Sequence, residues 1–190
     1  HNRCRRQRQM CIRDSLIAVP DFAMGAMENV GAVTFRETLL LIDVEKATRS
    51  ELSRSISVIA HELAHMWFGD LVTMNWWDGI WLNEAFASLM EVIASEATYP
   101  EFKLWNEMNQ DRSRGFGVDS LKSSRPVEFE VKSPEEAEEM FDVLTYQKGS
   151  TVLRMFETFI GEESFKEGVR NYLNKYEYKN THSSDLWNEL

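Results

Sequence analysis

The chain contains the stretch His61-Glu62-Leu63-Ala64-His65, on which the interpretation of the whole sequence depends. On a helix, residues four apart lie one turn apart on the same face, so both imidazoles can reach one metal ion. Zinc accepts neutral imidazole nitrogen, and a catalytic zinc usually has three protein ligands and a water molecule. Glu62 can face that water as a general base. The alternative is two partly buried histidines on a core helix, because so short a pattern also occurs in unrelated helices.

The neighbouring residues predict two helices and a third ligand. Apolar residues spaced three and four apart predict an amphipathic helix over 49–68, with Gly69 as its stop signal. A second helix is expected over 80–97, and an antiparallel return would place Glu84 beside the histidines. A carboxylate among the apolar residues of that helix is costly unless it is paired or bound to a metal. The sequence therefore predicts a zinc site here, and an ordinary exposed glutamate is the alternative for Glu84.

The other elements are expected to be mainly helical. A strand is predicted over 33–44, with a bend near Glu37, because this segment is rich in Val, Thr, Phe, Leu and Ile. A turn-rich stretch covers 115–133, and Ser133-Pro134 gives a helix start. Further helices are expected over 101–112, 134–140, 145–160, 162–176 and 183–190.

Length and composition restrict the class of protein. The 190 residues suit one domain, and the hydrophobic fraction of 43% with 27% charged residues is ordinary for a soluble globular protein. No apolar run approaches the roughly 18 residues of a membrane helix. The formal net charge of −10 argues against nucleic-acid binding, which needs an excess of Lys and Arg. We expect neither a nucleic-acid partner nor a membrane segment in this chain.

Residues 1–15 differ in composition from the rest. They hold five arginines, one acidic residue and both cysteines of the chain. Because of this abrupt change in composition, we interpret them as a non-native or disordered leader; they do not resemble a signal peptide, since no apolar segment follows the basic stretch. The remainder, residues 16–190, has no cysteine and is compatible with a reducing compartment. We therefore expect a cytoplasmic location.

Three motifs together resemble the M1 family of zinc aminopeptidases, gluzincins that include aminopeptidase N. The first is Gly25-Ala26-Met27-Glu28-Asn29, and the second is the histidine stretch followed by Met66-Trp67-Phe68-Gly69-Asp70. The third is the segment 81–88, which carries Glu84. The resemblance covers about residues 17–190. It departs from the family pattern at Val30, where an aromatic residue is common, and this puts fine specificity rather than the chemistry in doubt.

The resemblance implies an α+β, mainly helical fold, namely a partial thermolysin-like zinc peptidase catalytic domain over residues 16–190. Family members also carry an N-terminal β domain and a C-terminal helical domain, which are missing here. The implied function is that of a zinc-dependent aminopeptidase, which hydrolyses the N-terminal residue from peptides by metal-activated water. Its cofactor would be one Zn²⁺ per chain, and its partners would be peptide substrates with a free N-terminus.

The resemblance also implies a role for each matched metal-site residue. His61, His65 and Glu84 would hold zinc, and Glu62 would activate water. Glu28 would bind the free α-ammonium of the substrate, which suits an exopeptidase because a carboxylate anchors a charged terminus. The alternative for Glu28 is a surface acid in a loop.

Other residues of the substrate site follow from the same resemblance. The substrate motif includes Gly25, Ala26, Met27 and Asn29, and the small residues Gly25 and Ala26 allow an extended substrate to approach the backbone closely. Tyr146 matches the catalytic tyrosine of the family, whose phenol would donate a hydrogen bond to the oxyanion.

Two further residues have equally plausible structural roles. Glu91 lies two helical turns after Glu84 and could accept a hydrogen bond from the outer nitrogen of a zinc histidine, or it could be a solvated helix residue. Met24 could line the pocket for the first side chain of the substrate, or it could fill the core.

Two rival functions are less well supported. One is a relative within the family that opens lipid epoxides, but Ala26 and the lack of a lipid-specific signal favour a peptidase. The other is a non-catalytic scaffold, which usually loses a ligand or the base, whereas this sequence has both. Because the flanking domains are missing, these residues alone are expected to bind zinc but to hydrolyse peptides poorly.

Overall fold

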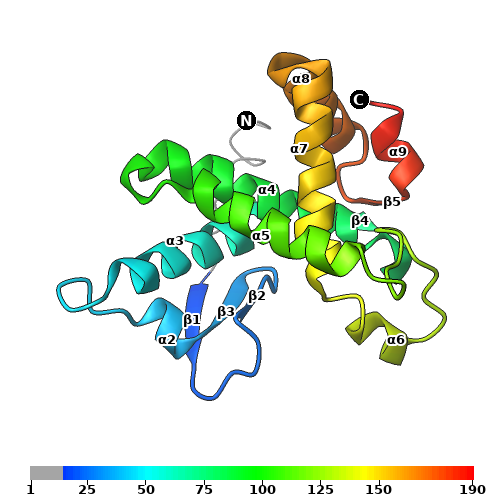
Figure 1. Cartoon of the computed structure of the whole chain (residues 1–190). Helices are drawn as coiled ribbons and strands as arrows, with labels where there is room; N and C mark the ends of the chain where they lie inside the picture. The colour runs from blue at the N-terminus through cyan, green and yellow to red at the C-terminus, as the bar shows by residue number, and fades with distance from the viewer. Residues whose placement is uncertain (1–14) are drawn as a thin grey trace, which may run out of the picture.

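A computed structural model describes residues 15–190, which are mainly helical with two small sheets (Figure 1). The strands are β1 (Ser15–Val19), β2 (Ala26–Met27), β3 (Ala32–Arg36), β4 (Val72–Met74) and β5 (Lys179–Thr181). The helices are α2 (Glu37–Leu40), α3 (Arg49–Ala64), α4 (Trp81–Thr98), α5 (Leu104–Asp119), α6 (Pro134–Glu138), α7 (Gly149–Ile160), α8 (Glu162–Lys175) and α9 (Ser183–Trp187). Three short helical turns are η1 (Trp77–Gly79), η2 (Pro100–Phe102) and η3 (Leu144–Lys148).

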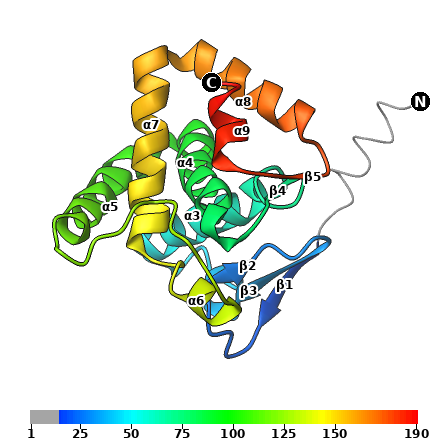
Figure 2. The same cartoon turned by 90° about the vertical axis from the view of Figure 1, so that its right-hand side faces the viewer.

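The helices separate the two sheets. Figures 1 and 2 show the sheet of β1, β2 and β3 at one end of the molecule and α7, α8 and α9 at the other, with α3 and α4 between them. None of the helices in residues 15–190 is long and apolar enough to cross a membrane.

The larger sheet has the strand order β1-β3-β2. β1 runs parallel to β3, and β2 runs antiparallel to it. Because β2 is the last strand in this order, it lies at an edge of the sheet. Val33 and Phe35 alternate with less buried residues and are fully buried, as expected for one face of a strand. Arg36 donates hydrogen bonds to the carbonyl oxygens of Phe22 and Ala23, which fixes the loop before β2. Apart from Ser15 in β1, the expected leader lies outside the described residues.

Helix α3 begins with a capping box and ends sharply. The hydroxyl of Thr48 accepts a hydrogen bond from the N–H of Glu51, and the Glu51 carboxylate accepts one from the N–H of Thr48. The helix ends at Ala64, four residues earlier than the sequence predicts, and the chain turns back through Gly69, whose φ is +143°. Glycine suits this turn because it adopts positive φ without strain.

Helix α4 forms the centre of the core and packs extensively against α3 and α7. Phe86 and Leu89 are fully buried, and the ring of Phe86 stacks on that of Phe68 with 4.3 Å between centroids. This apolar packing fixes α4 relative to α3 and therefore fixes Glu84 relative to the histidines.

The structure corrects two elements that the sequence predicts. The strand expected over 33–44 ends at Arg36, because α2 then buries Leu39 and the Ser55 hydroxyl of α3 donates to the Leu39 carbonyl oxygen at 2.6 Å. Helix α5 continues to Asp119 instead of stopping near 112. Gly115 lies inside it, and an added Cβ there would stand 3.3 Å from Gln147. The close packing that glycine allows outweighs its helix cost of about 1 kcal/mol.

Gly149→Ala is expected to destabilise the protein by about 1–3 kcal/mol, because overpacking strains a close helix contact. A Cβ at Gly149 would lie 2.7 Å from the Cβ of Ala85, where α7 meets α4. Gly117→Ala is the matched control, since a Cβ at Gly117 meets nothing within 4 Å. That change in α5 should raise the unfolding free energy by up to about 1 kcal/mol. Urea denaturation measures both, and equal effects of the two substitutions would contradict the packing argument.

Candidate metal centre and active-site cleft

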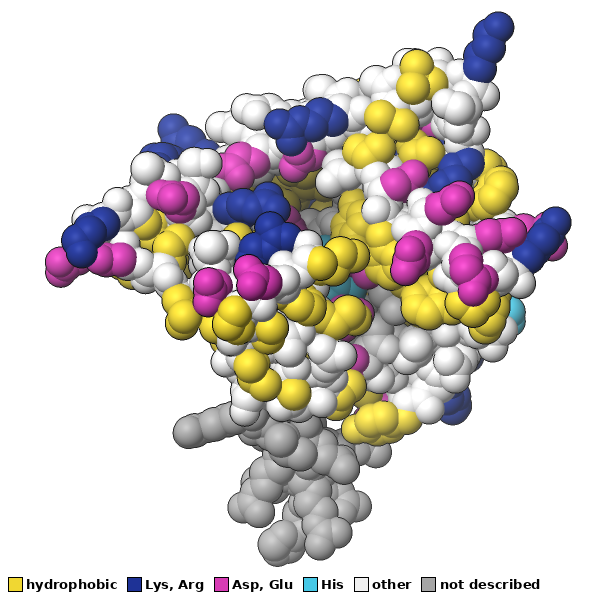
Figure 3. Space-filling model, turned by 90° about the horizontal axis from the view of Figure 1, so that it is seen from below, with side chains coloured by type: hydrophobic (Ala, Val, Ile, Leu, Met, Phe, Trp, Pro, Cys, Tyr) yellow, Lys and Arg dark blue, Asp and Glu magenta, His cyan; other side chains and the backbone are white. Residues whose placement is uncertain are grey.

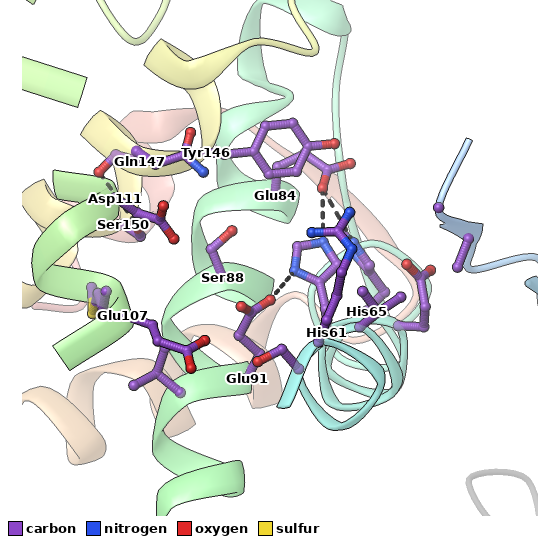
Figure 4. Close-up of a pocket in the computed structure, with 18 of the residues that line it drawn as sticks. His61, His65, Glu84, Ser88, Glu91, Glu107, Asp111, Tyr146, Gln147 and Ser150 are labelled. Atoms are coloured by element: carbon purple, nitrogen blue, oxygen red, sulfur yellow. Dashed lines mark hydrogen bonds and ion pairs between the residues drawn. The ribbon is translucent and has the colours of Figure 1, made fainter. Parts of the chain in front are cut away.

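Three side chains from two helices converge on one point (Figure 4). His61 and His65 project from α3, and Glu84 projects from the first turns of α4. The Nε2 atoms of His61 and His65 lie 3.2 and 3.3 Å from Oε2 of Glu84. His65 and Glu84 are almost completely buried. The structure therefore brings together the three residues for which the sequence predicts a shared metal ion.

The outer ring nitrogens indicate which atoms are available to a metal. Nδ1 of His65 lies 2.9 Å from the carbonyl oxygen of Phe68, which can only accept, so this nitrogen carries a proton. Nδ1 of His61 lies 2.8 Å from Oε2 of Glu91. Of the two roles that the sequence allows for Glu91, the structure therefore shows the contact with a histidine. With Nδ1 held by these contacts, Nε2 of each ring points toward Glu84 and is the atom that a metal can bind once it has lost its proton.

The donor set fits a zinc ion. The Nε2 atoms and the Glu84 carboxylate, at 3.2–3.3 Å, attract a positive charge between them, which is a ring proton when no metal is bound and can be a metal ion in its place. Ligands bonded at about 2.0–2.1 Å to a tetrahedral zinc lie about 3.3 Å apart. Two imidazoles and one carboxylate leave the fourth position of a catalytic zinc for water. Both the spacing and the chemistry of the three side chains match this metal.

The electrostatics of the cluster favour positive charge at its centre. Burial opposes ionisation of Glu84, but hydrogen bonds from His61 and His65 outweigh it and lower the pKa of Glu84 to about 2. Burial also opposes the charged form of His61, but its hydrogen bonds to Glu84 and Glu91 raise the pKa to about 10. At neutral pH Glu84 is therefore an anion that can bind a cation.

Two further carboxylates stand beside the cluster. Glu28, Glu62 and His65 each offer one ligand atom, and these atoms lie within 4.8 Å of one another. The Oε2 atom of Glu62 is buried and has no hydrogen-bond partner in residues 15–190. Burial raises the pKa of Glu62 to about 7, although His61 and His65 oppose the shift. A carboxyl group with such a pKa can both take up and release a proton near neutrality.

Tyr146 faces the cluster from η3 (Figure 4). Its ring stacks on that of His61, with 5.9 Å between centroids and 28° between planes. Burial raises the pKa of Tyr146 far above its usual value, and the carboxylates of Glu84, Glu28 and Glu62 add to the shift. The phenol is therefore protonated and can act as a hydrogen-bond donor.

These residues share a cleft of about 650 Å³. Figure 3 looks into a hollow in which histidine and acidic side chains are visible. Met24 and residues 25–28 line the cleft from β2 and the residues on either side of it. Met24 is 56% exposed, so it does not fill the core. Asn29 is not among the lining residues, and its amide instead donates to the hydroxyl of Thr34.

The cleft also contains side chains that the motifs do not indicate. Arg54 lies seven residues before His61 on α3, and Ser88 lies four residues after Glu84 on α4. Helical spacing from the ligands could have found both. Glu107 and Asp111 reach the cleft from α5 at a spacing of four residues, but nothing in the sequence says which face of α5 meets the metal.

The order of these residues along the chain agrees with a known family. The model of the peptidase family M1 domain matches residues 11–190. The chain belongs to peptidase family M1. This M1 chain is 50% identical over 179 residues to "Probable aminopeptidase 2" of Sulfurisphaera tokodaii, covering 94% of the chain and 23% of that relative. It is 49% identical over 177 residues to "Leucyl aminopeptidase" of Saccharolobus solfataricus, covering 92% and 22%.

Relatives in other kingdoms of life are almost as similar. The M1 chain is 47% identical over 176 residues to "Puromycin-sensitive aminopeptidase" of Caenorhabditis elegans, covering 92% of the chain and 19% of that relative. The chain spans about a fifth of the length of the curated relatives it matches.

Proposed function

We propose that this chain is the thermolysin-like catalytic domain of a zinc aminopeptidase, which releases the N-terminal residue of peptides. One observation carries the proposal. The ligand atoms of His61, His65 and Glu84 and the carboxylates of Glu62 and Glu28 are concentrated in one cleft. The names of the relatives support the same activity.

The first chemical task is activation of water. His61, His65 and Glu84 would hold the zinc, which supplies Lewis-acid activation of the scissile carbonyl group and of water. Glu62 takes the proton from the attacking water and later delivers it to the leaving amine. Its pKa of about 7 suits both steps, since neither protonation state is strongly disfavoured at neutral pH.

The second task is stabilisation of charge on the carbonyl oxygen. Tyr146 donates its phenolic hydrogen to the developing oxyanion, and its raised pKa keeps that hydrogen in place. The ring stacks on that of His61 and lines the same cleft as Ala26 and Met27 of β2.

The third task is selection of the N-terminus. Glu28 accepts hydrogen bonds from the α-ammonium group, so only the first peptide bond can reach the zinc. β2 is an edge strand, and none of the strands in residues 15–190 pairs with its outer edge. An extended substrate can add to this edge beside Gly25 and Ala26.

Glu28→Gln is expected to lower kcat/KM for peptides with a free N-terminus by about 10- to 100-fold, the effect of losing a hydrogen bond between charged groups. Zinc content should be unchanged, because Glu28 is not one of the three ligands. The measurement compares free and N-acetylated peptides of one sequence, using zinc-loaded protein in its full natural length. Wild-type protein should discriminate strongly against the acetylated peptide, and the variant should discriminate less. Equal hydrolysis of both peptides by wild-type protein would refute aminopeptidase activity.

A further inference from the structure

Tyr146 lies in an unusual turn of helix. Residues Leu144–Lys148 form a π-helical turn, in which the N–H of Gly149 donates to the carbonyl oxygen of Leu144, five residues earlier. Such turns insert one residue into a helix and often occur at functional sites. One residue corresponds to about 100° of helical rotation. The direction of the Tyr146 side chain therefore depends on how this turn is held.

Asp142 holds the beginning of the turn. Its Oδ1 accepts the N–H groups of Leu144 and Thr145, both at 3.0 Å. Its carbonyl oxygen accepts the N–H of Tyr146 at 3.1 Å. Asp142 thus acts as an N-terminal cap for the turn that carries the tyrosine.

Arg125 holds Asp142 from a distant part of the chain. Its Nη2 lies 2.6 Å from Oδ1 of Asp142, 3.1 Å from the Thr145 hydroxyl and 3.4 Å from the Met140 carbonyl oxygen. The Arg125 side chain is 14% exposed, and Thr145 is completely buried. The Asp142 side chain is 36% exposed, so this charge-assisted hydrogen bond is protected from water mainly on the side of the guanidinium group.

The end of the turn is tied to the same residue. Nζ of Lys148 donates to the carbonyl oxygen of Arg125 at 3.0 Å and to Oδ1 of Asp119 at 2.6 Å. The Arg125 side chain therefore bonds residues that precede Tyr146 in the chain, and the Arg125 carbonyl oxygen bonds Lys148, which follows it. The three residues Arg125, Asp142 and Lys148 enclose the turn.

We propose that Arg125 is a positioning residue for Tyr146, which fixes the π-turn through Asp142 and Thr145 and so sets the place of the phenolic oxygen. The inference rests on the proposed function, because it concerns the oxyanion donor of peptide hydrolysis. The competing explanation is a purely structural clamp that holds the segment between α5 and η3. The two explanations differ in whether the effect of Arg125 requires the Tyr146 hydroxyl.

The test uses the zinc-loaded protein in its full natural length. Arg125→Met removes the donors and keeps an unbranched side chain, while Asp142→Asn keeps a capping oxygen and removes the charge. Arg114→Met is the matched control, since Arg114 is 73% exposed and, among residues 15–190, forms an ion pair with Asp111 alone. Each variant is made with Tyr146 intact and with Tyr146→Phe.

With Tyr146 intact, Arg125→Met and Asp142→Asn should each lower kcat by about 10- to 100-fold, as expected for a slightly misplaced catalytic group. KM should stay within about twofold, because the lost contact forms only in the transition state. In the Tyr146→Phe background neither change should lower kcat further. Affinity for a phosphinic dipeptide analogue, measured by calorimetry, should fall in parallel with kcat. Affinity for the free amino-acid product should not fall.

Several results would overturn the proposal. A loss of kcat that persists in full in the Tyr146→Phe background means that Arg125 acts independently of the phenol. If Arg125→Met and Asp142→Asn lower kcat no more than Arg114→Met does, Arg125 does not position the phenol. If Arg125→Met does not fold, the near-isosteric Asp142→Asn decides the question. Wild-type protein that fails to release N-terminal residues refutes the proposed function first, and the positioning role falls with it.

Discussion

Glu62→Gln is expected to lower kcat for peptide hydrolysis by about 10²- to 10⁴-fold while the protein still binds one zinc per chain. The range is that of general acid–base catalysis by a positioned side chain. The amide has the same shape as the carboxylate but cannot take up a proton. Glu62 is buried near the end of α3, and the amide fills the same space, so the fold of the helix should be unchanged.

The control for this prediction is Glu107→Gln. Glu107 lines the same cleft from α5, and its carboxylate accepts a hydrogen bond from the Ser53 hydroxyl at 2.8 Å. The same loss of charge there should change kcat by less than about tenfold, because the side chain is held away from the reacting atoms. Steady-state kinetics with an amino-acid arylamide, together with elemental analysis, separates loss of the base from loss of the metal. A Glu62→Gln variant with bound zinc and unchanged kcat would exclude Glu62 as the base.

The metal centre could be predicted because helix geometry alone determines most of it. The spacing of His61 and His65 places both rings on one face, and the length of the connection returns Glu84 on the next helix. The family resemblance added Glu28 and Tyr146, which no spacing rule would connect to the metal. Both lie in the cleft, although their roles stay predictions. The cytoplasmic location also stays a prediction.

Other features depend on packing between segments far apart in the chain. The π-turn around Tyr146 depends partly on bonds that its flanking residues Asp142 and Lys148 form with Arg125 and Asp119, which lie far away in the chain. The sequence predicts a turn-rich stretch at residues 115–119 because of Gly115 and Gly117, but these residues are helical. Gly115 allows α5 to pack closely against η3, where a side chain would crowd Gln147. Local propensity is a weak prior when such a contact is available.

Glu84→Ala is expected to reduce zinc affinity by more than about 100-fold, because it removes a metal ligand. Loss of a residue that only hydrogen-bonds a ligand typically reduces metal affinity by about 10- to 100-fold. The two histidines alone also lack the negative charge that Glu84 supplies. Its pKa of about 2 shows that this charge is present throughout the neutral range. Glu91→Ala should have an intermediate effect of about 10- to 100-fold, because it only releases Nδ1 of His61.

A graded result therefore distinguishes a three-ligand site from a two-histidine site. Zinc affinity is measured by competition with a chromophoric chelator, and the rise in Tm on adding zinc gives a second readout. Glu163→Ala is the control, since its side chain is 85% exposed on α8 and lies outside the cleft. It should bind zinc as wild-type protein does. If Glu84→Ala kept wild-type affinity and the same rise in Tm, the carboxylate would not be a ligand. The short distances from Glu84 to both rings would then reflect hydrogen bonding alone.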